Sequence, residues 1–230
     1  MPDIKVIETR DGSSSLLIPE MNETYHSTHG AITESEYVFL KMGVDHFLEN
    51  HPNQNEIRIL EIGFGTGLNA WLTALAAEEL KVKFKFTSIE KFPLDSNLID
   101  QLNYKYKKDT AESRKIFENI HRADWGKECS IRDWFDLTKE QTDIADFNPA
   151  NESFDLIYFD AFAPSKQPEM WSQNVLTKMY DLLKNRGVFV TYCAQGQFKR
   201  DLKAVGFETE ELKGPPGKKE MTRGTKVEVI

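Results

Sequence analysis

The segment that most constrains the fold is a short turn with glycine at alternate positions, Gly63, Gly65 and Gly67, between an apolar run at 57–62 and an amphipathic stretch at 68–79. Glycine lets a backbone turn tightly and approach a ligand without a Cβ atom in the way. The first turn of the following helix adds N–H groups that have no partner within the helix. The sequence therefore predicts a ligand-binding loop between a buried strand and a helix, although a plain structural turn would show the same spacing.

Strand, turn and helix continue to alternate after this glycine loop. A strand at 84–89 closes a βαβ unit, and later apolar runs predict strands at 154–159 and 188–193. Such alternation is typical of a parallel sheet with helices on both faces. The remaining predicted elements are helices around 98–104, 113–121, 175–183 and 198–205 and closing strands at 207–212 and 226–230. With one further strand ending before Asp143, we expect an α/β fold with a mostly parallel, seven-stranded sheet.

The N-terminal part follows a different pattern. Residues 4–10 and 13–18 predict a hairpin joined at Asp11-Gly12, a pair that suits the positive φ angles of a type I′ turn. Thr33, with Glu36 three residues later, matches a capping box and predicts the start of a helix that ends at 51–53. We therefore expect residues 1–52 to form a hairpin, loop and helix packed on a single domain at 53–230.

The bulk composition limits the class of protein. The 29 Lys and Arg residues against 37 Asp and Glu give a net charge of −8, which disfavours nucleic-acid binding unless a local basic patch exists. No apolar run approaches the roughly 18 residues of a membrane-spanning helix. The N-terminus lacks the pattern of a signal peptide, and the 2 cysteines make no disulfide framework. These features lead us to expect a cytoplasmic protein with no membrane contact.

Acidic side chains stand where the first predicted strands end. The glycine spacing differs from the G-x-G-x-x-G of dinucleotide sites, which favours a cofactor without phosphate, such as S-adenosylmethionine. Glu61 can then accept hydrogen bonds from the ammonium group of that cofactor, and Glu90 lies near the offset at which an acidic residue meets ribose hydroxyls. Asp143 can accept from the adenine amino group if it ends the third strand. Solvated strand ends are the alternative for Glu90 and Asp143.

The predicted strand at 154–159 runs directly into Asp160. In open α/β sheets the ligand lies outside the carboxyl ends of the strands, so this carboxylate should face the methyl group that is transferred. It can accept a hydrogen bond from an attacking amine and stabilise the charge that develops on nitrogen. A structural role for Asp160 in the turn is the alternative.

Several motifs together resemble the methyltransferase module of the bifunctional tRNA-modifying protein MnmC, a module also found alone as MnmD. They are Glu-Ile-Gly-Phe-Gly-Thr-Gly-Leu-Asn from Glu61 to Asn69, Glu90-Lys91-Phe92-Pro93-Leu94, Asp160-Ala161-Phe162-Ala163-Pro164 with Trp171 beyond, and Gly217-Lys218-Lys219-Glu220-Met221. The early residues Tyr25, Ser27 and Glu34 also match the family, and we expect their loop to fold over the cofactor.

The resemblance implies a Rossmann-like class I fold and transfer of methyl from S-adenosylmethionine to the aminomethyl nitrogen of the modified wobble uridine in tRNA. It extends the cofactor contacts to Asn69 and Lys91. It also implies no flavin, because the FAD-dependent oxidase domain of the fused protein has no counterpart in this chain. No metal is expected either, since His26 and His29 have no further ligands nearby in the sequence.

Residues after Asp160 and near the C-terminus are candidates for substrate contact. Phe162 and Trp171 can stack on a flipped-out uridine, although core packing explains such aromatics equally well. Pro164 follows in the same motif. Lys218 and Lys219 lie in a Gly- and Pro-rich turn and can contact tRNA phosphates, with a solvated basic loop as the alternative.

Other functions share this fold class. A methyltransferase acting on a small molecule or protein is the main alternative, because the fold fixes the methyl donor and leaves the acceptor open. An NAD-dependent oxidoreductase is disfavoured by the glycine spacing. An aminopropyl transferase or a non-catalytic binding module would leave Glu61 or Asp160, respectively, without a role.

Overall fold

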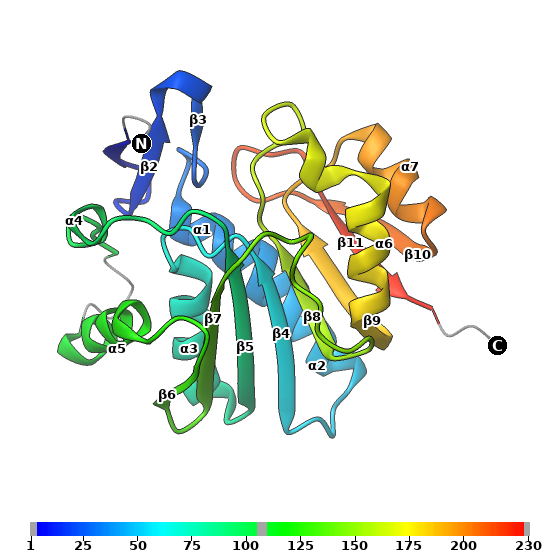
Figure 1. The fold of residues 1–230 in the computed structure, drawn as a ribbon, viewed down its shortest axis with the longest axis horizontal. Helices are drawn as coiled ribbons and strands as arrows, with labels where there is room; N and C mark the ends of the chain where they lie inside the picture. Colours follow the sequence, from blue (N-terminus) through cyan, green and yellow to red (C-terminus); the bar gives the residue numbers. More distant parts are fainter. Residues whose placement is uncertain (1–3, 105–109, 228–230) are drawn as a thin grey trace.

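Three parallel strands form the centre of the structure: β4 (Glu56–Ile62), β5 (Lys83–Glu90) and β8 (Phe154–Phe159). The computed structural model describes residues 4–104 and 110–227 (Figure 1). Helix α3 (Leu68–Leu80) connects β4 to β5, which confirms the predicted βαβ unit around the glycine loop.

The large sheet has the strand order β10-β11-β9-β8-β4-β5-β7-β6 within the described residues. The strands from β7 to β9 are parallel, whereas β6, β11 and β10 pair antiparallel at the two edges. Beyond the central strands, the sheet contains β6 (Glu128–Arg132), β7 (Phe135–Gln141), β9 (Leu183–Thr191), β10 (Phe207–Lys213) and β11 (Glu220–Lys226). This confirms the mostly parallel α/β sheet, and β6 extends the expected seven strands by one.

Each face of the sheet carries its own apolar core, because successive side chains of a strand point to opposite faces. Along β8, Leu156 and Tyr158 join the core formed with α3, whereas Ile157 and Phe159 join the other core. The helices of the two faces are α3 with α5 (Ala111–Arg122) on one side and α6 (Gln173–Leu182) with α7 (Gly196–Ala204) on the other (Figure 1). In the part of the chain that the structure describes, no helix combines the length and apolar character needed to cross a membrane.

A small N-terminal sheet consists of β1 (Lys5–Glu8), β2 (Ser14–Ile18) and β3 (Glu23–Thr24). A short 3-10 helix, η1 (Pro19–Met21), connects β2 to β3. The predicted hairpin is confirmed, but its type I′ turn is wrong. Glu8 pairs with Ser14, so the connection has five residues, and Gly12 alone among them has a positive φ angle, +80°. The Asp11 carboxylate accepts hydrogen bonds from Thr9 and Ser13, which stabilises this longer turn.

The predicted capping box at Thr33 is also wrong. The helix begins earlier, with α1 (Ala31–Ser35), and Thr33 donates from both its backbone nitrogen and its hydroxyl to Asp11, at 3.0 and 2.9 Å. The hairpin turn therefore supplies the acceptor for an N–H group in the first turn of the helix, which the helix itself leaves unpaired. Although burial opposes it, this set of hydrogen bonds lowers the pKa of Asp11 to about 2.

The same helix continues through a π-helical segment, η2 (Glu36–Asp45), into α2 (His46–Asn50). A helical period of 3.6 residues predicts an inner face of Tyr37, Leu40, Val44, Phe47 and Leu48. Val44 and Phe47 are buried as predicted, whereas Tyr37, Leu40 and Leu48 are only partly buried, and Val38 and Phe39 are buried as well. The wider π turns rotate the buried face relative to an α-helix. The segment η2 packs directly on β8 and β9. The division of the chain at residue 52 stays a prediction.

The sequence pattern is least clear over residues 96–142, and the predicted closing strand is misplaced. The helix at 113–121 is confirmed as α5, but the one at 98–104 reduces to α4 (Ser96–Ile99) among the described residues. The closing strand lies at β11 rather than 226–230, and residues 228–230 lie outside the described residues. β11 contains few apolar side chains, so its burial between β9 and β10 leaves no apolar pattern in the sequence.

Truncation of the core at Leu156 is expected to lower the free energy of unfolding by about 2–5 kcal/mol, because Leu156→Ala leaves a cavity under η2 at a fully buried position. Leu80→Ala, at the exposed end of α3, is the matched control and should change it by less than about 0.5 kcal/mol. Urea unfolding of both variants measures the difference, and equal values would contradict the packing described.

Candidate functional site

The glycine loop and the Asp160 loop touch at the carboxyl ends of β4 and β8. The Asp160 N–H donates to the Ile62 carbonyl at 3.1 Å, and a Cβ atom on Gly63 would lie 3.1 Å from the Asp160 carbonyl oxygen. The N–H groups of Gly63 and Phe64 donate to Ile89, at the end of β5. The loops that follow these strands therefore form one continuous surface, as the sequence predicted for Asp160.

Gly65 lies between Glu90 and Tyr25. Its N–H donates to one oxygen of the Glu90 carboxylate at 3.1 Å, and Phe92 N–H donates to the other at 2.8 Å. Gly65 has a φ angle of +49°, and a Cβ atom there would lie 3.1 Å from the Tyr25 ring. The position thus needs glycine both for its conformation and for space. Glu90 is fixed by these backbone donors and keeps lone pairs for hydroxyl groups.

Glu61 is a fully buried carboxylate. The Ser88 hydroxyl donates to one oxygen, while the other oxygen has no hydrogen-bond partner among the described residues. Burial raises the pKa of Glu61 well above its ordinary value, and the charges of Asp160 and Glu90 raise it further. The Asn69 side-chain oxygen is also buried without a partner. Two buried acceptors without donors fit the ammonium group of an amino-acid moiety such as that of S-adenosylmethionine.

Asp160 shares Asn69 with that acceptor pair. The Asn69 side-chain nitrogen, on the first turn of α3, donates to Asp160 Oδ2 at 2.9 Å. Burial and the nearby Glu34 carboxylate raise the pKa of Asp160 to about 7, while Asn69 and Lys218 act in the opposite direction. Asp160 can therefore exchange a proton near neutral pH, which suits a group that assists proton transfer.

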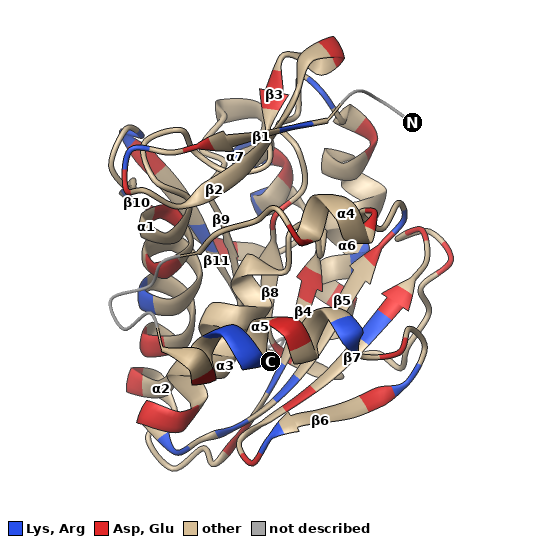
Figure 2. Ribbon diagram, turned by 90° about the vertical axis from the view of Figure 1, so that its left-hand side faces the viewer, with Lys and Arg blue, Asp and Glu red and all other residues tan. Residues whose placement is uncertain are grey.

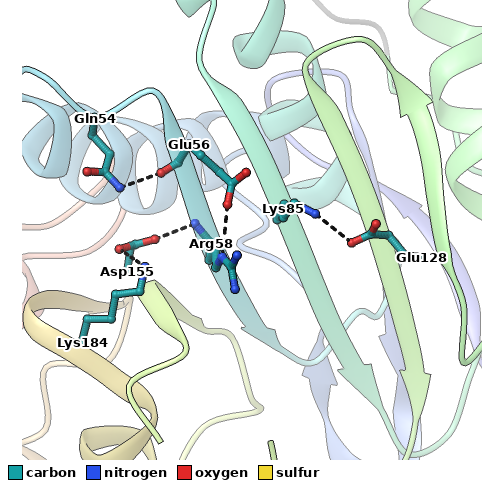
Figure 3. Close-up of polar contacts among 7 residues, drawn as sticks. All are labelled: Gln54, Glu56, Arg58, Lys85, Glu128, Asp155 and Lys184. Carbon is teal, nitrogen blue, oxygen red and sulfur yellow. Dashed lines mark hydrogen bonds and ion pairs between the residues drawn. The ribbon is translucent and has the colours of Figure 1, made fainter. Parts of the chain in front are cut away.

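The opposite end of the sheet shows what a purely structural carboxylate looks like here (Figure 3). Asp155, the second residue of β8, accepts from Arg58 N–H at 2.8 Å and from Lys184 Nζ at 2.8 Å. Its charge is matched by donors of the protein, as a buried carboxylate normally requires. Glu61 lacks such a match within the described residues, which makes the carboxyl end of the sheet the candidate ligand site.

The N-terminal residues named by the sequence lie at this site. The Tyr25 ring packs edge to face against Phe162, with ring centroids 5.2 Å apart. Ser27 N–H donates to Glu34 at 2.8 Å, and Glu34 is only 7% exposed. The structure thus brings the segment at 25–34 beside the Asp160 loop, and contact of these residues with a cofactor stays a prediction.

Lys91 and Asp143 pair with each other at 2.7 Å on the surface. Thr142 N–H donates to the Glu90 carbonyl, which brings the end of β7 beside the end of β5. Asp143 also accepts from Ala145 N–H at 2.9 Å, and these two contacts lower its pKa. Because exposed ion pairs are weak, a ligand can displace Lys91 at low cost. The adenine contact of Asp143 stays a prediction.

The predicted substrate residues separate into two groups. Phe162 packs on Tyr25, and Pro164 and Lys218 line one cavity with Tyr192, whereas Trp171 is only 6% exposed. Its ring packs against Phe159 and Phe198 in the core, and its indole nitrogen donates to the Phe162 carbonyl at 2.7 Å. Trp171 therefore supports the Asp160 loop in this structure and offers no free ring face for a base.

The two lysines of the C-terminal turn point in different directions. Lys218 Nζ lies 2.7 Å from a Glu34 oxygen and 3.7 Å from the centroid of the Tyr192 ring. The Lys219 side chain is 93% exposed and has only a long contact with Glu220, at 3.7 Å. Lys218 belongs to the interior of the site, and Lys219 alone of the pair faces solvent.

Sequence reasoning missed several supporting residues. His121, on α5, lies 3.1 Å from the Thr66 carbonyl through Nε2, and burial lowers its pKa to about 4, so the neutral ring donates this hydrogen bond. A Cβ atom on Gly67 would lie 3.0 Å from that ring. The Ser88 hydroxyl donates to Glu61, and the Tyr192 hydroxyl donates to the Ala161 carbonyl. A polar residue at the end of a predicted strand could have pointed to Tyr192; nothing in the sequence pointed to His121.

The size of a cavity does not distinguish this site from the rest of the surface. A cavity of about 1030 Å³ lies between η2, the outer face of α3 and residues 213–218, and a smaller one of about 390 Å³ adjoins Pro164 and Tyr192. The walls of the larger cavity include neither Glu61 nor Asp160. Within residues 4–104 and 110–227, no cluster of His, Cys, Asp or Glu side chains is suited to a metal ion.

Comparison with known proteins agrees with this geometry. Residues 102–227 match the model of a family described as S-adenosyl-L-methionine-dependent methyltransferase. The bifunctional tRNA 5-methylaminomethyl-2-thiouridine biosynthesis protein MnmC is 28% identical over 216 residues in Marinomonas sp. (strain MWYL1), covering 89% of this chain and 31% of that protein. MnmC of Idiomarina loihiensis is 31% identical over 220 residues, covering 88% and 35%. The chain thus spans about a third of the length of these relatives.

A solved structure shares the whole fold. The crystal structure of MNMC2 from Aquifex aeolicus superimposes with a TM-score of 0.78 at 26% sequence identity, covering 100% of this chain and 72% of that one. The Rossmann-like methyltransferase fold expected from the sequence is therefore confirmed, as is the dependence on S-adenosylmethionine.

Replacement of Gly65 by valine is expected to abolish S-adenosylmethionine binding, because a β-branched residue is strained at this φ angle and would displace Tyr25. Gly126→Val is the matched control: its φ angle is +73°, but no atom lies within 4 Å of the added Cβ. Calorimetry should show binding only in the control, and thermal unfolding reports the strain shared by both. Binding retained by Gly65→Val would contradict the role of the loop.

Proposed function

Because this chain belongs to the family of S-adenosyl-L-methionine-dependent methyltransferases, we propose that it methylates the aminomethyl nitrogen of the modified wobble uridine in tRNA. The product would be 5-methylaminomethyl-2-thiouridine, the nucleoside in the name of the MnmC relatives. One observation carries the proposal: the Asp160 carboxylate lies beside the glycine loop and is oriented by Asn69. A tRNA substrate also implies a cytoplasmic enzyme.

Each polar group of the site would bind one part of the cofactor. The free oxygens of Glu61 and Asn69 would hold the ammonium group, and Glu90 would accept from the ribose hydroxyls. Asp143 would accept from the adenine amino group, displacing Lys91. When bound, S-adenosylmethionine supplies a methyl group already activated by its sulfonium. The protein therefore needs mainly to align the acceptor and exclude water.

Asp160 would act on the acceptor nitrogen. During transfer the N–CH3 bond forms as the S–CH3 bond breaks, and the nitrogen loses one proton. The ionised carboxylate can accept a hydrogen bond from the amine, orient its lone pair and then take that proton. Since burial and Glu34 raise the pKa of Asp160 to about 7, the reactive form increases as the pH rises through neutrality.

The charge distribution favours a second candidate acceptor, a small molecule or a protein amine. Figure 2 shows acidic residues interspersed with basic ones over the strands and helices. Arg223 is held by Glu210 at 2.9 Å, and Lys199 pairs with both Glu211 and Glu220. Much of the basic patch near the C-terminus is thus neutralised within the protein, which weakens its attraction for phosphate.

Methylation of bulk tRNA that lacks the final modification decides between the two acceptors. We expect label from S-adenosylmethionine in one nucleoside, identified after digestion as the methylaminomethyl form. Fully modified tRNA is the control and should accept no label. Transfer to small amines with none to the unmodified tRNA would favour the second candidate.

Asp160→Ala is expected to reduce methyl transfer by at least about a hundredfold, because the amine loses its acceptor, with S-adenosylmethionine binding retained. Asp124→Ala, the control, removes an exposed carboxylate between α5 and β6 and should leave turnover unchanged. Single-turnover rates and calorimetry measure the two effects separately. Normal turnover in the Asp160 variant would rule out the assigned role.

Lys219→Ala is expected to weaken tRNA binding and to reduce the slope of log affinity against log salt by about 1, as loss of one phosphate contact does. Lys127→Ala, at a lysine just before β6 whose side chain is 69% exposed, is the control. An unchanged slope in the Lys219 variant would mean that this lysine only faces solvent.

A further inference from the structure

Two distant segments meet beside Asp160. The segment at 25–37 and the loop at 213–219 are linked by Tyr37, whose hydroxyl donates to the Lys213 carbonyl at 2.9 Å. His29 packs on Gly217 so closely that an added Cβ atom would lie 2.5 Å from its ring nitrogen. These contacts hold the loop against the segment and set the position of the residue that follows, Lys218.

Lys218 is directed into the site by two partners. Its ammonium lies 2.7 Å from a Glu34 oxygen and over the Tyr192 ring. Tyr192 in turn donates its hydroxyl to the carbonyl of Ala161, the residue after Asp160, at 2.8 Å. The ion pair is therefore adjacent to the Asp160 loop, and Glu34 is buried within it.

This arrangement leaves an uneven set of charges around Asp160. Glu34 and Lys218 both act on Asp160 electrostatically, Glu34 favouring the protonated form and Lys218 the ionised form. Glu61 and Tyr192 also face it, each interacting with its charge, and Asn69 donates to it. Without Lys218, two carboxylates would adjoin the acceptor position with no cation between them.

Such a pair of carboxylates would favour the wrong form of an amine. A negative environment stabilises an ammonium ion, and an ammonium has no lone pair with which to attack a methyl group. We propose that Lys218 is a positioning residue whose charge offsets that of Glu34, so that the acceptor nitrogen meets the single negative charge of Asp160. This inference rests on the proposed methylation of an amine and replaces the phosphate contact expected for Lys218 from the sequence.

The cost of breaking the ion pair supports this assignment. A phosphate that drew Lys218 outward would leave Glu34, 7% exposed, as a buried carboxylate with Ser27 N–H as its one donor among the described residues. Removing one partner of a buried ion pair is strongly destabilising. Lys219 can contact phosphate at no such cost, since its side chain already lies in solvent.

The test uses variants that change the charges near Asp160, and two properties are measured for each variant. Carboxyl ¹³C resonances give the pKa of Asp160 directly, with the signal assigned by its loss in Asp160→Asn. The pH dependence of methyl transfer gives the acid limb of activity. Lys218→Met is expected to move both upward by about one pH unit, and Glu34→Gln should move both downward. The double variant should return both close to the parent values, because it removes the two charges together.

Lys41→Met is the matched control. Lys41 is an exposed lysine whose Nζ also lies near a tyrosine ring, 5.7 Å from the centroid of Tyr37, but its charge is not among those that act on Asp160. It should shift neither reading, and it should leave the S-adenosylmethionine affinity measured by calorimetry unchanged. If Lys218→Met fails to fold, Glu34→Gln still tests the proposal through its downward shift.

The possible results separate this inference from the proposed function. An Asp160 signal that titrates at the same pH in the Lys218 and Glu34 variants overturns the charge balance. So does loss of tRNA affinity in Lys218→Met with a reduced salt slope and an unmoved acid limb, which would restore the phosphate contact. If the parent protein methylates no tRNA while the titrations shift as described, the charge balance stands and the tRNA substrate is wrong.

Discussion

The parallel pairing of β4 with β5 on one side and β8 on the other is the constraint on which the site depends. Parallel strands end at the same edge of a sheet, so the residues that terminate them become neighbours whatever their separation in the chain. Glu61, Glu90 and Asp160 meet in this way. The apolar cores on both faces of the sheet hold the strands in register, and the register in turn fixes how far these carboxylates lie from one another.

That constraint also explains which parts could be predicted. An apolar strand followed at once by glycines or by Asp160 is visible in the sequence. Because parallel strands end at the same edge of the sheet, this pattern already predicts that these residues are neighbours. A strand before Asp143 was expected, but the bounds of β7 could not be predicted because its alternation is polar: Lys139, in its middle, is only 1% exposed. Its ammonium donates to the His121 carbonyl at the end of α5. A charged residue that is buried through a partner far along the chain carries no local signal.

The errors in the N-terminal part have a similar origin. Thr33 and Glu36 match the sequence pattern of a capping box, but the acceptor that the helix uses is the Asp11 carboxylate in the hairpin turn. Lys218 and Lys219 look equivalent in sequence, and only the position of Glu34 distinguishes them. In each case the sequence named the right residues, and a long-range partner decided what they do.

The link between Glu34 and Lys218 also bears on how the site is assembled during synthesis. The groups proposed to bind the cofactor from Glu61 to Glu90 come from one compact βαβ unit, which can form as soon as that stretch has left the ribosome. The acceptor side joins Glu34, which precedes that unit in the sequence, to Lys218, which follows it. A nascent chain can thus acquire its methyl-donor half well before it has a place for the molecule to be methylated.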